Sequence, residues 1–530
     1  MKTQLYDYII IGAGSAGCVL ASRLSEDPAA KVLLLEAGGE CRSPIASTPA
    51  LYGELQDSPY DWGDRTAPQT GLNGRRIFLP QGRTLGGSSA INYMIYIRGN
   101  RFDYDEWAER GAEGWSYEEV LPYFLRSEGN RRLSDRFHSS DGPLIVSSHK
   151  PNPLVERYLR AGQEIGLPFN PDFNGCSQDG CGPLQATLAD GARCSVTEAF
   201  LSPARRRPNL TVLTHARALK IRLEGRRALG VDYLRLGAAE SARAANEVIL
   251  SAGAVRSPQL LMLSGIGPRA ALESCGVDVR VDLPGVGKSL QDHLHTRVRC
   301  AITAPLTFGG LPEAEKEAAR RQYHKDRSGP LASNFLEAGA FVKIDSSETR
   351  PELQLFFLAQ LAPDFPEAGA LSRHGLTFTA YINRPRSRGA VLLASADPLD
   401  RPIIDFNYLS VAEDLRCAVA GVRCNLQLLY AKAFDDIRGE EIAPGAHARS
   451  DAEIEAFVRR TASTTWHPAG SCKMGKDDMS VVDSALRVYG VEALRVVDAS
   501  VMPTIVSGNT NAPVIMIAEK AADLIRRGIV

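Results

Sequence analysis

The 530-residue sequence is marked first by what it lacks. It has no uninterrupted apolar run that approaches the roughly 20 residues a membrane-spanning helix requires. Its formal net charge is only −1, so there is no basic excess to hold a polyanion. It also has no internal repeats, no low-complexity segment and no clean linker. We therefore expect no nucleic-acid partner and no membrane span.

The ten cysteines lack the spacing of a metal or disulfide framework. None of them forms a CxxC pair, and they are scattered over the whole chain. His293 and His295 form an H-x-H pair, but no acidic or cysteine cluster completes a ligand set. The sequence therefore predicts free, mostly buried thiols and no metal site.

The N-terminus lacks the pattern of a secretory signal. Its apolar run, residues 8–11, is only four residues long and leads directly into a glycine-rich turn. This run is typical of the first strand of a mature fold. We expect a soluble, cytoplasmic protein.

Length and patterning predict more than one packed unit. The chain is too long for one ordinary core, although 44% hydrophobic and 23% charged residues are usual for a globular protein. A strand, a glycine turn, a helix and a second strand between residues 6 and 36 form one βαβ unit. Glycine and proline between residues 38 and 90 predict little regular structure. Further strands are expected over 210–250, 335–343, 353–358, 376–383 and 389–394, and helices over 102–128, 312–328, 411–433, 451–461 and the C-terminus.

The first glycine turn carries a dinucleotide signature. Gly12, Gly14 and Gly17 give G-x-G-x-x-G directly after the strand and before the helix. These glycines allow a tight turn, close approach of a pyrophosphate and close helix packing. Glu36 ends the next strand, 19 residues after Gly17, where a carboxylate binds ribose hydroxyls and disfavours a 2′-phosphate. The motif does not separate NAD from FAD, but its place at the N-terminus, continuing into Ala37-Gly38-Gly39, favours FAD.

Five longer blocks identify a family resemblance. They read GRTLGGSSAINYM at 82–94, GAVRSPQLLMLSGIGP at 253–268, LPGVGKSLQDH at 283–293, WHPAGSCKMG at 466–475 and VVDASVMPTIVSGNTNAPVIMIAEKAAD at 496–523. Together they resemble the glucose–methanol–choline (GMC) oxidoreductases over essentially the whole chain. Among these, 5-hydroxymethylfurfural oxidase and aryl-alcohol oxidases look most similar, followed by choline dehydrogenase-like members.

The resemblance implies an α/β fold, α+β overall, with two interleaved domains. A Rossmann-like FAD-binding domain would use residues 1–150, 200–300 and 460–530. A substrate-binding domain, with an antiparallel sheet flanked by helices, would use residues 151–199 and 301–459.

The resemblance also implies the cofactor contacts. Gly14 and Ser15 would lie at the pyrophosphate, and Gly12 and Gly17 would shape the turn. The other implied contacts are Glu36 and Ala37 at the ribose, Trp62 and Ala218 at the adenine, Gly87, Ser88, Asn92, Met94 and Trp466 along the ribityl chain and flavin, Asp498 and Ala499 near the pyrophosphate, and Pro513 and Val514 at a helix N-terminus facing the flavin. Some relatives attach FAD through a histidine, but the equivalent position here is Ile91. We expect non-covalent FAD.

The chemistry implied is oxidation of a primary alcohol. His467 resembles the family's catalytic histidine and would accept the hydroxyl proton, since an imidazole of pKa near 6.5 is mostly neutral at pH 7. Asn511 is expected at the second position, donating a hydrogen bond to the substrate oxygen. The flavin would take the hydride and be reoxidised by O2 or another acceptor.

The substrate is less sharply indicated. Phe356 and Trp466 could form an apolar slot for an aromatic or furanic alcohol, although Phe356 fits an ordinary core position equally well. Glu367 could admit a polar or cationic group or face solvent. Two alternatives stay open: a choline or aliphatic alcohol dehydrogenase that passes electrons to a quinone, and an FAD-containing hydroxynitrile lyase. The sequence does not indicate the oligomeric state.

Overall fold

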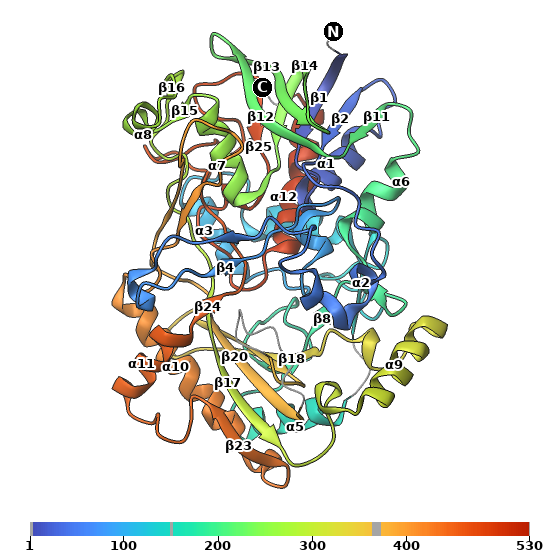
Figure 1. The fold of residues 1–530 in the computed structure, drawn as a ribbon, viewed down its shortest axis with the longest axis vertical. Helices are drawn as coiled ribbons and strands as arrows, with labels where there is room; N and C mark the ends of the chain where they lie inside the picture. Colours follow the sequence, from blue (N-terminus) through green and yellow to red (C-terminus); the bar gives the residue numbers. More distant parts are fainter. Residues whose placement is uncertain (1–3, 149–151, 363–372, 529–530) are drawn as a thin grey trace.

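Two sheets at opposite ends of the molecule organise the fold (Figure 1). The structure is a computed structural model that describes residues 4–148, 152–362 and 373–528. In Figure 1 the first sheet lies at the top, close to both chain termini, and the second lies at the bottom. Extended segments and short helices between residues 44 and 100 run between the two sheets.

The first sheet contains the βαβ unit that the sequence predicts. β1 (Gln4–Ile11) is parallel to β2 (Val32–Leu35), and α1 (Ser15–Leu24) connects them. The strand order is β11-β2-β1-β14-β13-β12, with β25 beside β14. The other strands are β11 (Leu210–Leu213), β12 (Ala216–Glu224), β13 (Arg227–Arg235), β14 (Ala238–Leu250) and β25 (Leu494–Val496). The C-terminal helix α12 (Asn511–Arg526) packs against α1, so the two ends of the chain build one layer.

The second sheet is antiparallel along its main path. Its order is β23-β17-β20-β19-β18-β7, and β24 pairs with β17. These strands are β7 (Gly180–Pro183), β17 (Leu294–Ile302), β18 (Leu336–Val342), β19 (Leu353–Leu358), β20 (Gly375–Ile382), β23 (Arg438–Ala443) and β24 (Ser463–Thr464). Helix α10 (Ala412–Leu429) packs on β17, β19 and β20. The opposite face of the sheet is directed toward the first sheet and forms one wall of the cavity described below.

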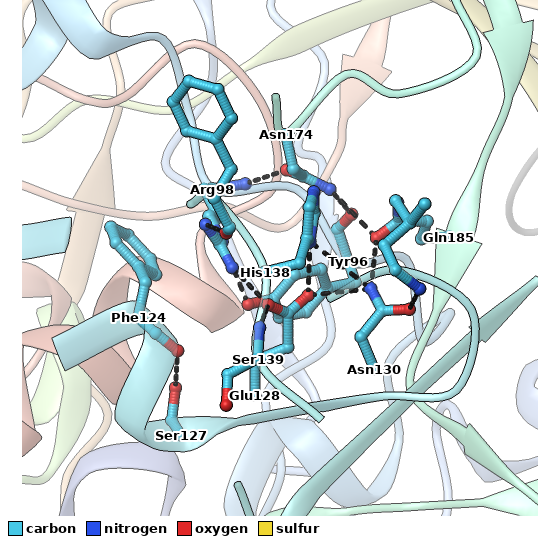
Figure 2. A network of polar contacts seen from close by, with 12 residues as sticks. Tyr96, Arg98, Phe124, Ser127, Glu128, Asn130, His138, Ser139, Asn174 and Gln185 are labelled. Atoms are coloured by element: carbon cyan, nitrogen blue, oxygen red, sulfur yellow. Dashed lines mark hydrogen bonds and ion pairs between the residues drawn. The ribbon is translucent and has the colours of Figure 1, made fainter. Parts of the chain in front are cut away.

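A buried polar network supports the segment that joins the two halves (Figure 2). Arg98 pairs with Glu128, and both side chains are almost completely buried. His138 lies between two carboxylates, with Nδ1 3.0 Å from Glu128 Oε1 and Nε2 2.9 Å from Asp172 Oδ2. The Asn174 side chain accepts a hydrogen bond from the Arg98 backbone N–H at 2.9 Å. These contacts fix residues 96–98, which begin two residues after the predicted cofactor contact at Met94.

The fold class predicted from the sequence is confirmed. A Rossmann-type sheet and an antiparallel sheet flanked by helices are built from alternating parts of the chain. Helix α9 (Glu313–Asp326) and helix α11 (Asp451–Thr461) lie where helical patterning was expected. β17 begins at residue 294 and belongs to the second sheet, while the predicted division assigned residues up to 300 to the first unit. The division of the chain into domains stays a prediction.

Candidate functional site

The glycine loop between β1 and α1 is shaped by close backbone contacts. Gly12 has a φ of +101°, and a Cβ there would lie 2.4 Å from the carbonyl oxygen of Ser251. A Cβ on Gly17 would lie 1.9 Å from the carbonyl oxygen of Gly12. Only glycine permits both contacts, because a side chain at residue 12 would collide with the backbone that follows β14, and one at residue 17 would push α1 away from the loop. The loop thus holds the free N–H groups of the first turn of α1 at the carboxyl edge of the parallel strands, where dinucleotide phosphates bind.

A second glycine loop approaches the first. Gly87 has a φ of +52°, and a Cβ there would lie 2.6 Å from Cα of Gly14. Ser88, the next residue, accepts a hydrogen bond from the Gly82 backbone N–H at 3.2 Å. Because both loops present bare backbone at their contact, the cavity there is lined by Gly14 and Gly87 themselves. This is the arrangement that lets a pyrophosphate approach main-chain N–H groups.

Glu36 follows β2 at the same edge of the sheet. Its carboxylate accepts hydrogen bonds from the backbone N–H groups of Ala13 at 3.0 Å and Gly38 at 2.8 Å. Burial raises the pKa of Glu36 to about 7, even though these hydrogen bonds favour the charged form. The neighbouring Ala37 also lines the cavity. Glu36 therefore lines the cavity at the edge of the sheet where the sequence predicts a contact with the ribose, and that contact stays a prediction.

The end of the cavity beyond Glu36 is bounded by an aromatic ring and arginines. The Arg256 guanidinium lies over the Trp62 ring, 4.4 Å from its centroid, and pairs with Asp64 at 2.8 Å. Ala218 on β12 lines the same end. The position of Trp62 and Ala218 suits the adenine end of a dinucleotide.

One cavity of about 940 Å³ joins these features to the second sheet. The carboxylate of Asp498, at the middle of the cavity, accepts hydrogen bonds from Ser257 Oγ at 2.5 Å and from the Gly253 backbone N–H at 2.9 Å. Of the residues predicted from the sequence, the cavity is lined by Gly12, Gly14, Ser15, Glu36, Ala37, Trp62, Gly87, Ser88, Asn92, Met94, Ala218, Phe356, Trp466, His467, Asp498, Ala499, Asn511 and Val514. Gly17 and Pro513 lie behind the wall, in the helices α1 and α12. The size and donor set of the cavity fit an FAD molecule.

His467 lies where the cavity meets the second sheet. Its Nδ1 is 2.9 Å from Nδ1 of the fully buried His293, whose Nε2 is 2.9 Å from the backbone oxygen of Asn383. The backbone N–H of His467 donates to Asp292 at 2.7 Å. Burial lowers the pKa of His467 well below 6.5, and the nearby His293 lowers it further.

The hydrogen-bond chain determines which nitrogen of His467 carries its proton. The carbonyl oxygen of Asn383 can only accept, so His293 Nε2 is the donor in that contact. Burial lowers the pKa of His293 to about 4, so this ring is neutral and its Nδ1 accepts. His467 Nδ1 must then donate. Nε2 of His467 is left as a lone pair on the cavity side.

The side chain beside this lone pair is Asn509, and the predicted Asn511 lines the same cavity. Nδ2 of Asn509 lies 3.3 Å from His467 Nε2. Asn511 begins α12, and its Oδ1 accepts a hydrogen bond from Ser15 Oγ at 2.7 Å. The helix start directs Asn511 toward α1, whereas the non-helical segment before it places Asn509 beside the histidine. The buried Oδ1 of Asn509 has no hydrogen-bond partner in the described structure.

The substrate end of the cavity is lined by aromatic rings. Trp466, which has a φ of +64°, meets Tyr93 edge to face at 5.0 Å between ring centroids. The ring centroids of Tyr93 and Tyr52 lie 3.8 Å apart, and Phe356 faces the cavity from β19. Sequence reasoning named Phe356 and Trp466 but missed both tyrosines, because they lie in the irregular stretch between residues 48 and 95. Glu367, the third predicted pocket residue, lies outside the described residues.

Two absences concern only the described part of the chain. No group of three histidine, cysteine or acidic side chains there has the geometry to hold a metal ion. No helix in those residues combines the length and apolarity needed to cross a bilayer.

The Rossmann-type loop and the neutral histidine at the far end of one cavity define a dinucleotide-dependent oxidoreductase. Family models described as GMC oxidoreductase match residues 6–295 and 385–518. The chain therefore belongs to the GMC oxidoreductase family and is an FAD-dependent alcohol oxidoreductase, as the sequence predicts.

Individual relatives match along almost their entire length. The chain is 44% identical to an oxygen-dependent choline dehydrogenase of Photobacterium profundum, covering 98% of this chain and 93% of that one. It is also 44% identical to an alcohol dehydrogenase [acceptor] of Pseudomonas putida, over 99% and 96%. Among solved structures, pyridoxine 4-oxidase from Mesorbium loti matches with a TM-score of 0.89 at 32% identity, over 98% and 99%.

Proposed function

We propose that the protein oxidises primary alcohols, aromatic or furanic ones in particular, to aldehydes, with His467 as the base and O2 as the final electron acceptor. The observation that carries this proposal is the lone pair of a neutral His467, fixed on the cavity side by His293. Removing hydride from an alcohol carbon without removing the hydroxyl proton would leave a strongly acidic protonated carbonyl. A base within reach of that proton avoids this cost and typically accelerates such a step by about 10²–10⁴-fold.

Asn509 takes the role that the sequence assigned to Asn511. Its amide N–H group is beside Nε2 of His467, so an alcohol oxygen that displaces this contact meets a donor and an acceptor together. The donor stabilises developing alkoxide, while the lone pair accepts the proton. Asn511 instead connects the first turns of α1 and α12 through Ser15.

The chain's own residues hold the cofactor without a covalent bond. The glycine loops at Gly14 and Gly87 would take the pyrophosphate, and Glu36 the ribose. The first turn of α12, with Val514 on the cavity wall, would place a helix N-terminus beside the ring system. FAD bound there supplies a two-electron acceptor for the hydride. Ile91 lines the cavity where some relatives carry a histidine, and its hydrocarbon side chain cannot form a flavin linkage.

The aromatic walls support a planar substrate. Tyr93 and Trp466 contact each other edge to face, an arrangement that also suits an added ring. We retain one alternative, a choline or aliphatic alcohol dehydrogenase that passes electrons to a quinone. It is supported by two relatives at 44% identity, which are named a choline dehydrogenase and an alcohol dehydrogenase. Nothing in the comparisons supports a hydroxynitrile lyase.

Anaerobic mixing tests the proposal. Purified yellow protein is mixed with benzyl alcohol, 5-hydroxymethylfurfural, choline or 1-octanol, and bleaching of the visible flavin band is followed. We expect the ring alcohols to bleach the flavin fastest and readmitted oxygen to restore it with formation of peroxide. Bleaching by choline alone would overturn the substrate assignment, and no bleaching by any alcohol would overturn the activity. Release of the yellow chromophore by acid precipitation checks that the flavin is non-covalent.

A further inference from the structure

A buried arginine lies behind the wall that is proposed to hold the flavin. Residues 87–94 contribute several members of the cavity lining, among them Asn92 and Met94. Arg193, on the two-residue strand β10 (Ala192–Arg193), contacts this segment from behind and does not itself line the cavity. The residue is only 5% exposed. A guanidinium in such a place needs partners, because burying a charge is costly.

The guanidinium of Arg193 connects two separate segments of the chain. Nη1 donates to the backbone oxygen of Ser89 at 3.2 Å and to that of Asn92 at 2.7 Å. Nε donates to the backbone oxygen of Ala46 at 2.8 Å. One side chain thus holds residues 89–92 in place from the side opposite to the cavity.

Arg193 also determines the orientation of the Asn92 side chain. Asn92 Oδ1 accepts hydrogen bonds from Arg193 Nη1 at 2.8 Å and from the Met94 backbone N–H at 3.0 Å. The opposite orientation of the amide would place Nδ2 against two donors, which excludes it. Because both lone pairs of the oxygen are used, the N–H groups of Asn92 are the part of this cavity-lining side chain that is left for a ligand.

The positive charge of Arg193 is not paired with a hydrogen-bonded carboxylate. Among the described residues, its acceptors are backbone oxygens and the Asn92 amide, and its buried Nη2 has no hydrogen-bond partner. Burial lowers the pKa of Arg193 to about 10, and attraction to Glu198 opposes this change, so the guanidinium is charged at pH 7. Glu198 is exposed, and its carboxylate accepts a hydrogen bond from the Ser195 backbone N–H at 2.9 Å. Water therefore screens Glu198 more than it screens Arg193.

We propose that Arg193 belongs to the cofactor site and that, from behind residues 89–92, its buried positive charge favours the reduced form of the flavin. This inference rests on the cofactor contacts proposed for residues 87–94. A flavin that accepts a hydride gains negative charge, so a cation fixed behind the wall stabilises the reduced form relative to the oxidised form. Because the protein already holds Arg193 in place, no rearrangement is needed when this charge develops.

The size of the effect can be set by Coulomb's law. Two unit charges roughly 6–10 Å apart, at an effective dielectric constant of about 20, change an equilibrium by about 10- to 100-fold. For a two-electron couple this corresponds to about 30–60 mV. Salt should have little influence on the shift, because a buried charge is screened weakly.

Arg193→Gln tests the inference, because glutamine removes the charge and can still donate to the same backbone oxygens. The midpoint potential of the bound flavin is measured by anaerobic titration against a reference dye, with a reductant that is not an alcohol. We expect the reduction equilibrium to fall about 10- to 100-fold, a potential lower by about 30–60 mV. Arg193→Lys, which keeps the charge, should stay within about threefold of the wild-type equilibrium. Arg416→Gln, at an exposed arginine that pairs with Glu413, should leave it unchanged.

Two results would overturn the inference. They are a wild-type potential in Arg193→Gln, and a potential in Arg193→Lys as low as that in Arg193→Gln. If Arg193→Gln purifies without FAD, its apoprotein decides by far-UV circular dichroism and urea denaturation. An apoprotein as stable as that of the wild type that binds FAD at least 10-fold more weakly supports the assignment. An unfolded apoprotein would show that Arg193 serves only the fold, and the inference would be wrong.

The same titration separates this inference from the proposed function. It uses no alcohol, so it reports on the flavin whether or not the protein oxidises one. If no alcohol bleaches the flavin while Arg193→Gln lowers the potential, the proposed activity fails and the role of Arg193 stands. If alcohols bleach the flavin and the potential does not depend on Arg193, the activity stands and this inference fails.

Discussion

Replacing His293 by leucine removes the acceptor that fixes the proton of His467. The His293 ring is completely buried, and its Nδ1 lies 2.9 Å from Nδ1 of His467. Without it, the hydroxyl of Thr465, 3.3 Å from Nδ1 of His467, is the remaining side-chain partner within the described residues. A buried donor left unpaired costs about 1–3 kcal/mol, and 1.36 kcal/mol is tenfold in rate. We therefore expect His293→Leu to lower kcat by about 10- to 100-fold.

The assay is single-turnover flavin reduction by benzyl alcohol in anaerobic stopped flow. Because His293 does not line the cavity, the KM should stay within about threefold while kcat falls. His293→Asn restores an acceptor and should recover most of the rate, which a purely structural role would not explain. His447→Leu, at an exposed histidine, is the matched control. A His293→Leu enzyme that reduces its flavin within twofold of wild type would refute the assignment of the protons.

Three other predictions follow from the site and the core. Asn509→Ala should lower kcat/KM by about 10- to 100-fold, because a donor to the substrate oxygen is lost. Asn511→Ala should act mainly on FAD affinity, because its side chain connects α12 to Ser15. Equal kinetic losses in the two variants would contradict this assignment. Apoprotein should bind FAD more weakly as the pH falls through about 7, where Glu36 becomes protonated, and fluorescence titration of Glu36→Gln should show no such dependence. Burial would lower the pKa of His138, but the carboxylates of Asp172 and Glu128 raise it to about 9. The protonated ring therefore stabilises the fold fully below pH 6.5, and this stabilisation is lost as the pH rises through about 9. His138→Leu should cost about 3–5 kcal/mol of unfolding free energy at pH 7 and less at pH 10, measured by urea denaturation; a loss that is constant with pH would contradict the charged pairing.

The parts of the site that are contiguous in sequence could be predicted. The glycine turn at Gly12 and Gly14 and the carboxylate of Glu36 lie in one βαβ unit, whose local patterning determines their relative places. His467 could be found because its block is long and distinctive. The helices over 312–328 and 451–461 could also be predicted, since each has strong local patterning and few breaks.

The parts that depend on packing between distant segments could not be predicted. Asn509 and Asn511 are two residues apart in one asparagine-rich turn, and only the packed structure shows that Asn509 contacts His467 while Asn511 contacts Ser15. β17 was not predicted as a strand, so the alternation that brings His295 and Arg297 to the cavity was not visible. The partner of His467, His293, is 174 residues away in the chain, and the sequence indicates it only as one half of an H-x-H pair.

The most direct test of the account is flavin reduction in His467→Ala. The variant should purify with FAD and the wild-type visible spectrum, because the cofactor contacts at the glycine loops are untouched. Its rate of anaerobic flavin reduction by benzyl alcohol at pH 7 should fall by about 10²–10⁴-fold. A His467→Ala enzyme that bleaches its flavin at close to the wild-type rate would show that another group accepts the hydroxyl proton, and the central claim would be wrong.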